Sequence, residues 1–381
     1  MANTIPSALI TTMYAAMDTV SREMVGFIPA VTLDPSAARA ALNQTVYAAI
    51  APAAAAGDIT PAAASPDDGD QTLGTLALTI TKARRVAFRW NGEQFLTAQN
   101  GPGGQQIQTN QIAQAIRTLV NEIEVDLGRL YQKASRAYGT AGTTPFATAG
   151  DFTDAAEVRK ILADNGAPMT DLQLVLNTTA GAKFRGKQAQ WQTTGNTGFQ
   201  ESGVFERLHG LSLRESAGVA NHTKGTGTSY QLNNAAGYAA GSTTVAVDTG
   251  SGTIVAGDVF TNSQSGRDAN KYVVGTALSA GSLALNAPGI QKAWVDDDTV
   301  AVGNSYAANL AFSRSAIILA TRTPALPPEG DIAVDRMQIT DPMSLLTFEL
   351  SMYPQYKQMQ YELAIVWGAT AKPEHCAILL G

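Results

Sequence analysis

The chain has 381 residues and a mass of 39.8 kDa, and its 26 basic and 32 acidic residues give a net charge of −6 and an isoelectric point near 5.2. Apolar residues make up 45% and charged residues 15%, which excludes a disordered or highly charged protein. The small number of Lys and Arg argues against tight DNA binding, and the single cysteine, Cys376, excludes a disulfide framework.

The N-terminal stretch predicts an amphipathic helix, because Leu9, Met13, Met17, Val20 and Met24 follow the spacing of one helix face. Two interpretations stay open: Met13 and Met17 lie on a neighbouring subunit, or the helix docks on its own domain. The stretch has no basic start and is interrupted by charged residues, so we expect no targeting or membrane segment.

Residues 51–71 are rich in Ala, Pro, Gly and Asp and predict a loop or mobile arm. Alternating apolar residues follow at 76–80 and 86–90, and they predict an antiparallel hairpin with its tip at 81–85. Basic residues lie at and beside this tip: Lys82, Arg84, Arg85 and Arg89. Acidic residues come just before it: Asp67, Asp68 and Asp70. The hairpin is either a solvated surface element or a projection that reaches acidic residues of another subunit.

The strongest helical pattern precedes Gly139, where we expect the helix to end. Its apolar stripe consists of Ile112, Ile116, Leu119, Ile123, Leu127, Leu130 and Ala134. At 1.5 Å per residue, about 30 residues extend roughly 45 Å. Such a helix is expected to act as a spine, with one side packed on a sheet.

A short capped helix is predicted from Thr153 or Asp154 to Gly166, and a strand at 172–176. A mixed polar segment, 177–218, follows. Its expected hydrophobic anchors are Trp191, Phe199 and Phe205.

From 221 to 303 the sequence becomes rich in Gly, Ser, Thr and Asn, and it predicts a small all-β insertion domain with a sandwich or barrel-like core. The predicted strands lie at 244–247, 253–255, 259–261, 272–274 and 283–285. A buried strand is then expected at 310–322, a turn at 324–330, and two strands at 346–352 and 361–367. The predicted fold class is α+β with one all-β insert.

Known catalytic patterns are missing from the sequence: there is no nucleophile elbow and no phosphate-binding P-loop. His209, His222 and His375 are not spaced as metal ligands, and neighbouring strand residues such as His375 and Cys376 point apart. We therefore expect no enzyme activity, no cofactor and no metal.

The acidic run Asp296, Asp297 and Asp298 is either a cation site or, as we favour, a solvated turn or salt-bridge partner. Glu122, Glu124 and Asp126 alternate along the long helix, so we do not expect them to converge as catalytic carboxylates.

Four segments, in order, resemble P22-type phage coat proteins over residues 70–381. They are the helix 115–127, the insert motifs around Val245 and Asp258, the strand 309–322, and the C-terminal run Trp367-Gly368 with Lys372-Pro373-Glu374. The resemblance implies a major capsid protein with the HK97-like fold of tailed double-stranded-DNA bacteriophages.

The regions implied by this resemblance follow the chain. They are an N-terminal arm (1–45), an extended hairpin loop (46–103), the spine helix with the first part of the peripheral and axial domains (104–220), the insert (221–303) and the returning strands (304–381).

The resemblance also implies self-assembly into hexamers and pentamers of an icosahedral procapsid in the bacterial cytoplasm, with a scaffolding protein and a portal protein. The chain would then belong to the virion shell and would touch packaged double-stranded DNA only weakly and without sequence specificity, in line with its acidic charge. A decoration protein is left open.

We assign the basic hairpin to acidic residues of a neighbour, either 67–70 or 296–298. Two other classes remain as alternatives. The Gly/Ser/Thr-rich insert suggests an extracellular adhesin or lectin-like module, and an unfamiliar site would allow a hydrolase.

Overall fold

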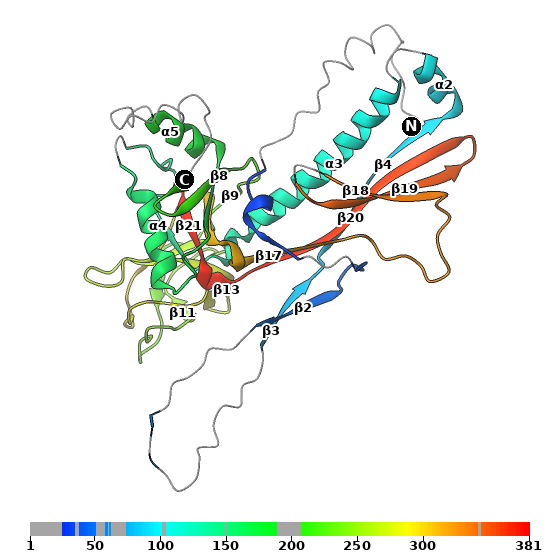
Figure 1. Cartoon of the computed structure of the whole chain (residues 1–381). Coiled ribbons are helices and arrows are strands. Elements are labelled where there is room, and N and C mark those ends of the chain that lie inside the picture. Colours follow the sequence, from blue (N-terminus) through cyan, green and yellow to red (C-terminus); the bar gives the residue numbers. More distant parts are fainter. Residues whose placement is uncertain are drawn as a thin grey trace.

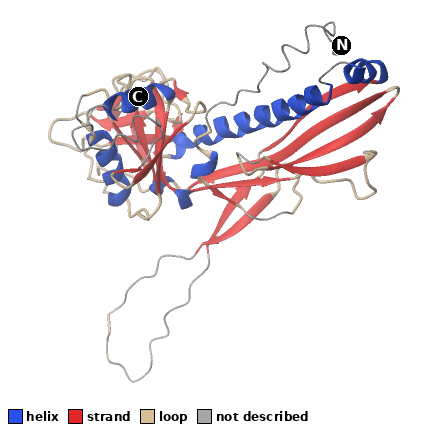
Figure 2. Cartoon of the chain, turned by 45° about the horizontal axis from the view of Figure 1, so that its top comes forward, coloured by secondary structure: helices blue, strands red, loops and turns tan. Residues whose placement is uncertain are grey.

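The computed structural model describes residues 25–34, 38–50, 58–59, 61, 74–100, 104–148, 151–188, 207–341 and 344–381. These residues form a compact body, an elongated extension and a thin two-stranded ribbon that projects from their junction (Figures 1 and 2). The N-terminal helix with Met13 and Met17 lies outside the described residues. So do Asp67, Asp68, Asp70 and the predicted anchors Trp191, Phe199 and Phe205.

The extension is a six-stranded sheet with a long helix along it (Figure 1). Its strand order is β1 (Thr32–Leu33), β17 (Ile317–Arg322), β20 (Gln358–Ala371), β19 (Thr347–Gln355) and β18 (Asp335–Thr340), and β4 (Lys82–Asn91) also pairs with β20. Helices α2 (Gly92–Asn100) and α3 (Gly104–Gly128) follow β4. The apolar stripe of α3, centred on the fully buried Leu119 and Ile123, packs with Phe348, Leu363 and Ile365 of the sheet. One side of this helix therefore packs on a sheet, as its apolar stripe predicts.

The long helix ends earlier than its hydrophobic pattern predicts. After α3 the chain tightens into a 3₁₀ turn, η2 (Arg129–Lys133), and then forms strand β5 (Arg136–Tyr138). A side chain at Gly128 would lie only 2.2 Å from the carbonyl oxygen of Gly218, so the backbone of another segment crosses here. Leu130 and Ala134 continue the apolar stripe into the core without continuing the helix.

The body is built on a thirteen-stranded sheet. Its main path runs through β10 (Gln231–Leu232), β11 (Thr244–Asp248), β14 (Ser282–Leu285), β13 (Lys271–Ser279), β5, β21 (Cys376–Leu380), β16 (Tyr306–Ser313), β6 (Leu172–Leu176), β8 (Leu211–Glu215) and β7 (Arg207–Leu208). Beside this path lie β9 (Asn221–His222), β12 (Val259–Asn262) and β15 (Val300–Val302). Helices α4 (Thr153–Asp164) and α5 (Thr178–Gln188) and the 3₁₀ turns η1 (Ile28–Ala30), η4 (Arg314–Ala316) and η5 (Pro373–His375) complete the description.

Several predicted elements are confirmed. Strand β6 has the predicted bounds, and α4 lies where a short helix is expected, although its N-cap residue is Phe152 and makes no side-chain cap. Strands β11, β12, β13 and β14 appear in the predicted insert and surround a separate apolar cluster centred on Trp294, Phe260 and Tyr272.

Other predictions are wrong in detail. Residues 253–255 form no strand, and the single strand expected at 310–322 is two strands, because η4 turns the chain from the body sheet into the extension sheet. Strand β18 was not expected, since its sequence, DRMQIT, is mostly polar.

The predicted hairpin of 76–80 with 86–90 is also wrong. Strand β3 (Gly74–Thr79) pairs with β2 (Thr45–Ile50), whereas β4 pairs with β20 over its whole length. The chain changes sheets at the fully buried Ile80, which packs with Ala40, Ala320 and Val366. The β2–β3 pair is called the ribbon below.

Candidate subunit interface

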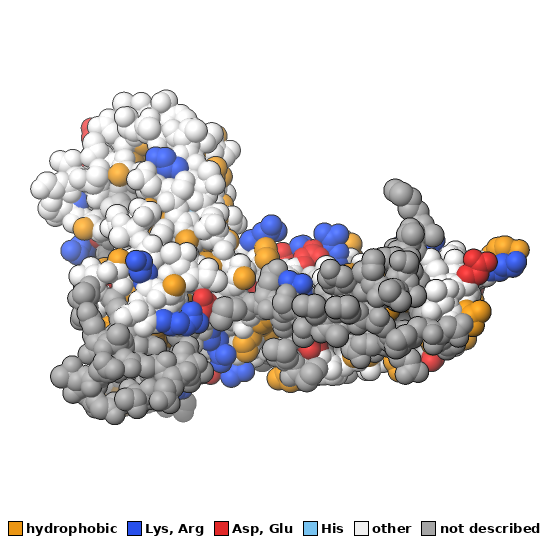
Figure 3. Space-filling view, turned by 90° about the horizontal axis from the view of Figure 1, so that it is seen from above, with side chains coloured by type: hydrophobic (Ala, Val, Ile, Leu, Met, Phe, Trp, Pro, Cys, Tyr) orange, Lys and Arg blue, Asp and Glu red, His pale blue; other side chains and the backbone are white. Residues whose placement is uncertain are grey.

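The four basic residues of the predicted tip lie along strand β4, within the extension sheet. Lys82 Nζ lies 3.0 Å from Glu122 Oε1 and 2.8 Å from Asp126 Oδ2, both on α3. Arg84 Nε also reaches Glu122 Oε1 at 3.0 Å. Basic and acidic side chains accordingly lie next to one another over the extension (Figure 3).

Lys82 is the centre of this charged cluster. Burial alone lowers the pKa of Lys82, but hydrogen bonds and attraction from Asp126 and Glu122 outweigh it, so the pKa is raised. The ammonium lies 5.8 Å from the centre of the Trp367 ring, and Trp367 Nε1 donates to Asp126 at 3.0 Å. The cluster therefore links β4, α3 and β20.

The remaining two basic residues differ from each other. Arg85 Nη1 lies 2.5 Å from Glu362 Oε2, diagonally across the β4–β20 pair, while Arg89 is exposed and has no ion pair within the described residues. Three of the four basic side chains thus have acidic partners in their own chain. Their contact with a neighbouring subunit stays a prediction, but they do not form the tip of a projecting hairpin.

The ribbon crosses the extension sheet at Gly368. A Cβ at Gly368 would lie 2.1 Å from the carbonyl oxygen of Thr79, at the end of β3. Only glycine fits at this approach. The aromatic-Gly pair Trp367-Gly368, singled out in the sequence, therefore has two physical roles: the indole anchors the charged cluster and the glycine lets the ribbon cross.

Beyond the crossing, the ribbon has no third strand among the described residues. Tyr47 on β2 is 69% exposed, and Leu42, which precedes the start of β2, is 51% exposed. An isolated two-stranded pair is at best marginally stable in water, because it buries little apolar surface. The ribbon is therefore a surface that another molecule would stabilise.

Apolar side chains also gather along the outer edge of the extension sheet, around β18. Among the described residues β18 pairs only with β19, so its other edge keeps free backbone groups. Nearby exposed apolar residues are Ile332, Val334, Met337 and Leu345. Exposed sheet edges with apolar side chains are typical of contact surfaces.

Glu124 is a site residue that sequence reasoning missed. It is buried on α3 and accepts hydrogen bonds from the backbone amides of Gly26 (2.5 Å), Phe27 (2.6 Å) and Ile28 (3.0 Å) and from Ser216 Oγ (2.6 Å). Burial raises the pKa of its carboxyl, and these donors oppose that rise. A weak signal was present: Glu124 lies one turn after Val120, an apolar residue beside the predicted stripe that is buried in the structure.

The acidic run of the insert is a turn bonded to its own domain. Asp298 is 5% exposed and binds Arg267 Nε at 3.3 Å and Asn262 Nδ2 at 2.8 Å. Asp296 accepts from the Asn234 amide at 2.6 Å, and Asp297 has a positive φ of 61°. The salt bridge expected for this run is confirmed for Asp298. Because Asp298 is buried, it is poorly placed to bind a neighbouring subunit.

His222 and Cys376 of the body are both buried. His222 lies 2.8 Å from both the Tyr131 hydroxyl and Asp258 Oδ1, and all three are buried between η2 and the insert. Cys376 is fully buried, which raises the pKa of its thiol to about 12 and keeps it protonated. Within the described ranges, no His, Cys, Asp and Glu cluster could hold a metal ion. In that same part of the chain, no helix is long and apolar enough to cross a membrane.

No protein-family model matches this sequence, and no curated protein matches it. The structure is similar to solved phage capsids. It aligns with a chain of the capsid structure of the cyanophage P-SCSP1u over 100% of this chain and 99% of that one, with 11% identity and a TM-score of 0.51. The chain shares its fold with this capsid chain.

Two further solved structures are less similar. A chain of Mycobacterium phage Che8 has 12% identity and a TM-score of 0.46 over 94% of this chain and 92% of that one. A capsid chain of an empty GTA particle has 9% identity and a TM-score of 0.45 over 99% of both chains.

Proposed function

We propose that this chain is the major capsid protein of a tailed double-stranded-DNA bacteriophage, of the P22-type coat protein family with an HK97-like fold. The observation that carries the proposal is the alignment with the cyanophage capsid chain, which spans this chain from end to end. A fold alone does not assign a function, so the surfaces of this chain supply the second argument.

The ribbon and the β18 edge support self-association. Both leave backbone hydrogen-bonding groups and large apolar side chains exposed on an elongated molecule. A copy of the same chain that added a strand or covered Tyr47 would satisfy them, and head-to-tail contacts of this kind close into rings. The proposed hexamers and pentamers of an icosahedral shell are consistent with such contacts.

The remaining features of the proposal come from the resemblance. The subunits would assemble with a scaffolding protein and a portal protein in the bacterial cytoplasm, and the mature shell would enclose DNA with weak contacts. The proposed regions remain 1–45, 46–103, 104–220, 221–303 and 304–381. The role is structural and not enzymatic.

The proposal is tested with the full chain and one ribbon variant pair. Size-exclusion chromatography and negative-stain microscopy of the purified protein should show rings, tubes or closed shells. Tyr47→Glu should abolish these assemblies and leave the melting temperature unchanged, while Tyr47→Phe, which keeps the ring, should assemble normally. A wild-type protein that stays monomeric at every concentration would refute the proposal.

A further inference from the structure

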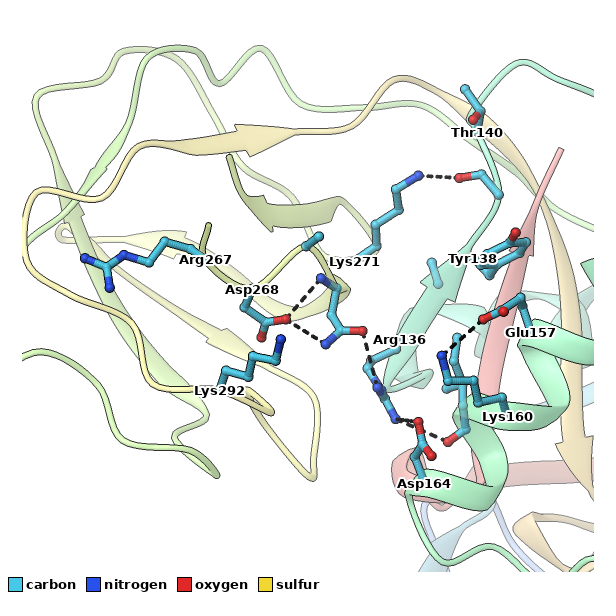
Figure 4. Close-up of a pocket in the computed structure, with 15 residues that line it drawn as sticks. Arg136, Tyr138, Thr140, Glu157, Lys160, Asp164, Arg267, Asp268, Lys271 and Lys292 are labelled. Carbon is cyan, nitrogen blue, oxygen red and sulfur yellow. Dashed lines mark hydrogen bonds and ion pairs between the residues drawn. The ribbon is translucent and has the colours of Figure 1, made fainter. Parts of the chain in front are cut away.

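A cleft of about 480 Å³ lies within the body, between the predicted insert (221–303) and the part of the body formed by α4 and β5 (Figure 4). Helix α4 and strand β5 form one wall, and the start of β13 with the turn before it forms the other. Sequence reasoning gave no role to this region. Its volume lies within the range of small-molecule sites, about 300–1,000 Å³.

Cationic side chains enter the cleft from all of these elements. Lys160 comes from α4, Arg136 from β5, Lys271 from β13, and Lys292 from the segment after β14. In Figure 4, dashed lines join Lys160 to Glu157, Arg136 to Asp164 and Lys271 to a backbone oxygen, whereas Lys292 is drawn without one. With Arg267 the lining holds five basic residues against three acidic ones.

The three acids already have partners. Glu157 binds Lys160 at 3.5 Å, and Asp164 lies 3.7 Å from Arg136. Asp268, which is 1% exposed, accepts hydrogen bonds from Asn270 and the Tyr272 hydroxyl. Arg267 also has a partner, Asp298 outside the lining, so Lys271 and Lys292 are the cations of the lining without an ion pair among the described residues.

Two cations of the lining are only partly satisfied, although Nη2 of Arg136 lies 3.7 Å from Asp164. Arg136 is 3% exposed, and its Nε has no hydrogen-bond partner within the described residues. Lys271 has the carbonyl oxygen of Gly139 as its acceptor and no carboxylate within ion-pair distance in the described part of the chain. A buried donor without an acceptor is costly, and an anion in the cleft would supply an acceptor for Arg136 Nε and a negative charge for the half-buried Lys271. Burial lowers the pKa of Lys271, and a bound anion would reverse that effect.

We propose that this cleft binds a phosphate-type oxyanion, held by Lys271, Lys292 and Arg136, with the half-buried ring of Tyr138 beside it. Several cations converging from different elements suit a polyvalent anion better than a single carboxylate. The proposal does not depend on the role of the chain in a shell. The phosphate group would come either from a free polyphosphate or from a nucleic-acid backbone.

A bound anion would also fasten the insert to the body. Between β13 and β5 the sheet register has two pairs, Lys271 with Ala137 and Tyr272 with Arg136. An oxyanion bonded to groups of both walls would add to this short connection. Binding should therefore raise the melting temperature of the full chain.

Calorimetric titration with inorganic pyrophosphate at constant ionic strength tests the proposal, with thermal unfolding as the second readout. We expect saturable binding to one site, weakened about tenfold or more by Lys271→Gln and by Lys292→Gln. Lys224→Gln, which removes an exposed lysine of the same insert, is the matched control and should leave binding unchanged. Because Lys271 also bonds Gly139, the exposed Lys292 supplies a variant that is expected to fold normally.

A second titration with a short single-stranded oligodeoxynucleotide separates the two sources of phosphate. Binding of pyrophosphate that both variants weaken supports a free anion as the ligand. Binding of the oligonucleotide alone, with the same sensitivity, supports the same cleft with nucleic acid as the source. Absence of saturable binding by both probes, or equal binding by Lys271→Gln, Lys292→Gln and Lys224→Gln, overturns the proposal.

Discussion

The body and the extension bury their cores in different ways. The body surrounds its central strands β21, β16 and β6, so that Leu310, Phe312 and Leu379 are fully buried. The extension is one sheet with one long helix, and it exposes a strand edge, several apolar side chains and the ribbon. The two regions share one apolar cluster, which includes Phe312 of the body and Leu363 of the extension, so they do not fold as separate units. Under the proposed function, the exposed surfaces of the extension are the ones that another copy would cover.

The largest expected effect is at the crossing of the ribbon. Gly368→Ala would place a Cβ 2.1 Å from Thr79 O and should destabilise the protein by about 3 kcal/mol or more, or prevent soluble expression. Gly92→Ala is the matched control, since nothing lies within 4 Å of its Cβ position. It should change stability by less than about 1 kcal/mol. Equal unfolding midpoints for the two variants would show that the crossing is not tight.

The next effect concerns the junction of the two regions. Glu124→Ala leaves three backbone amides and the Ser216 hydroxyl without their acceptor and should cost roughly 2–3 kcal/mol. Glu124→Gln keeps one acceptor oxygen and should lose less. Gln114→Ala, at an exposed position of the same helix, serves as control in chemical denaturation. A loss for Gln114→Ala as large as that for Glu124→Ala would contradict the role of Glu124.

A smaller effect on stability should distinguish Lys82 from Arg89, both on β4. Lys82→Met removes the partner of Glu122 and Asp126 and should lower stability by about 1 kcal/mol. Arg89→Met on the same strand should change it by less than about 0.5 kcal/mol. Thermal unfolding at low and high salt provides the check, because only the Lys82 effect should shrink as salt increases. Equal effects at both positions would show that the ion pairs of Lys82 do not stabilise the protein.

The smallest effect is a pH dependence in the body. Burial, with help from Lys372 and against Glu374, lowers the pKa of His375 below its usual value of about 6.5. Protonation therefore favours the unfolded state, so this group lowers stability only as pH falls below 6.5. Wild type should lose stability more steeply than His375→Gln between pH 7 and pH 5. Parallel curves would show that His375 does not contribute.

The sequence predicted those helices and strands whose formation depends mainly on the residues within the same segment. Strand β6 is a short continuous apolar run buried on both faces, and the α3 stripe repeats at helical spacing, so both were visible in the sequence. The residues of a strand do not indicate which other strand it pairs with. Strand β4 pairs with β20, some 270 residues away, and the alternation of 86–90 says nothing about that choice.

The candidate interface was only partly predictable for the same reason. The basic residues of β4 were found, but their partners Glu122, Asp126 and Glu362 come from elements that only the tertiary fold brings together. The early end of α3 depends on the approach of Gly218, and the role of Glu124 depends on the amides of residues 26–28. None of these contacts has a signature within one segment.

Hydrogen–deuterium exchange of the free and the assembled full chain tests the central claim most directly. The account predicts that amides of 45–50, 74–79 and 335–340, in the ribbon and along the β18 edge, become protected on assembly, while those of β6 and β21 are protected in both states. Ribbon and β18 amides that exchange equally fast in both states would contradict the claim that copies of this chain complete the extension.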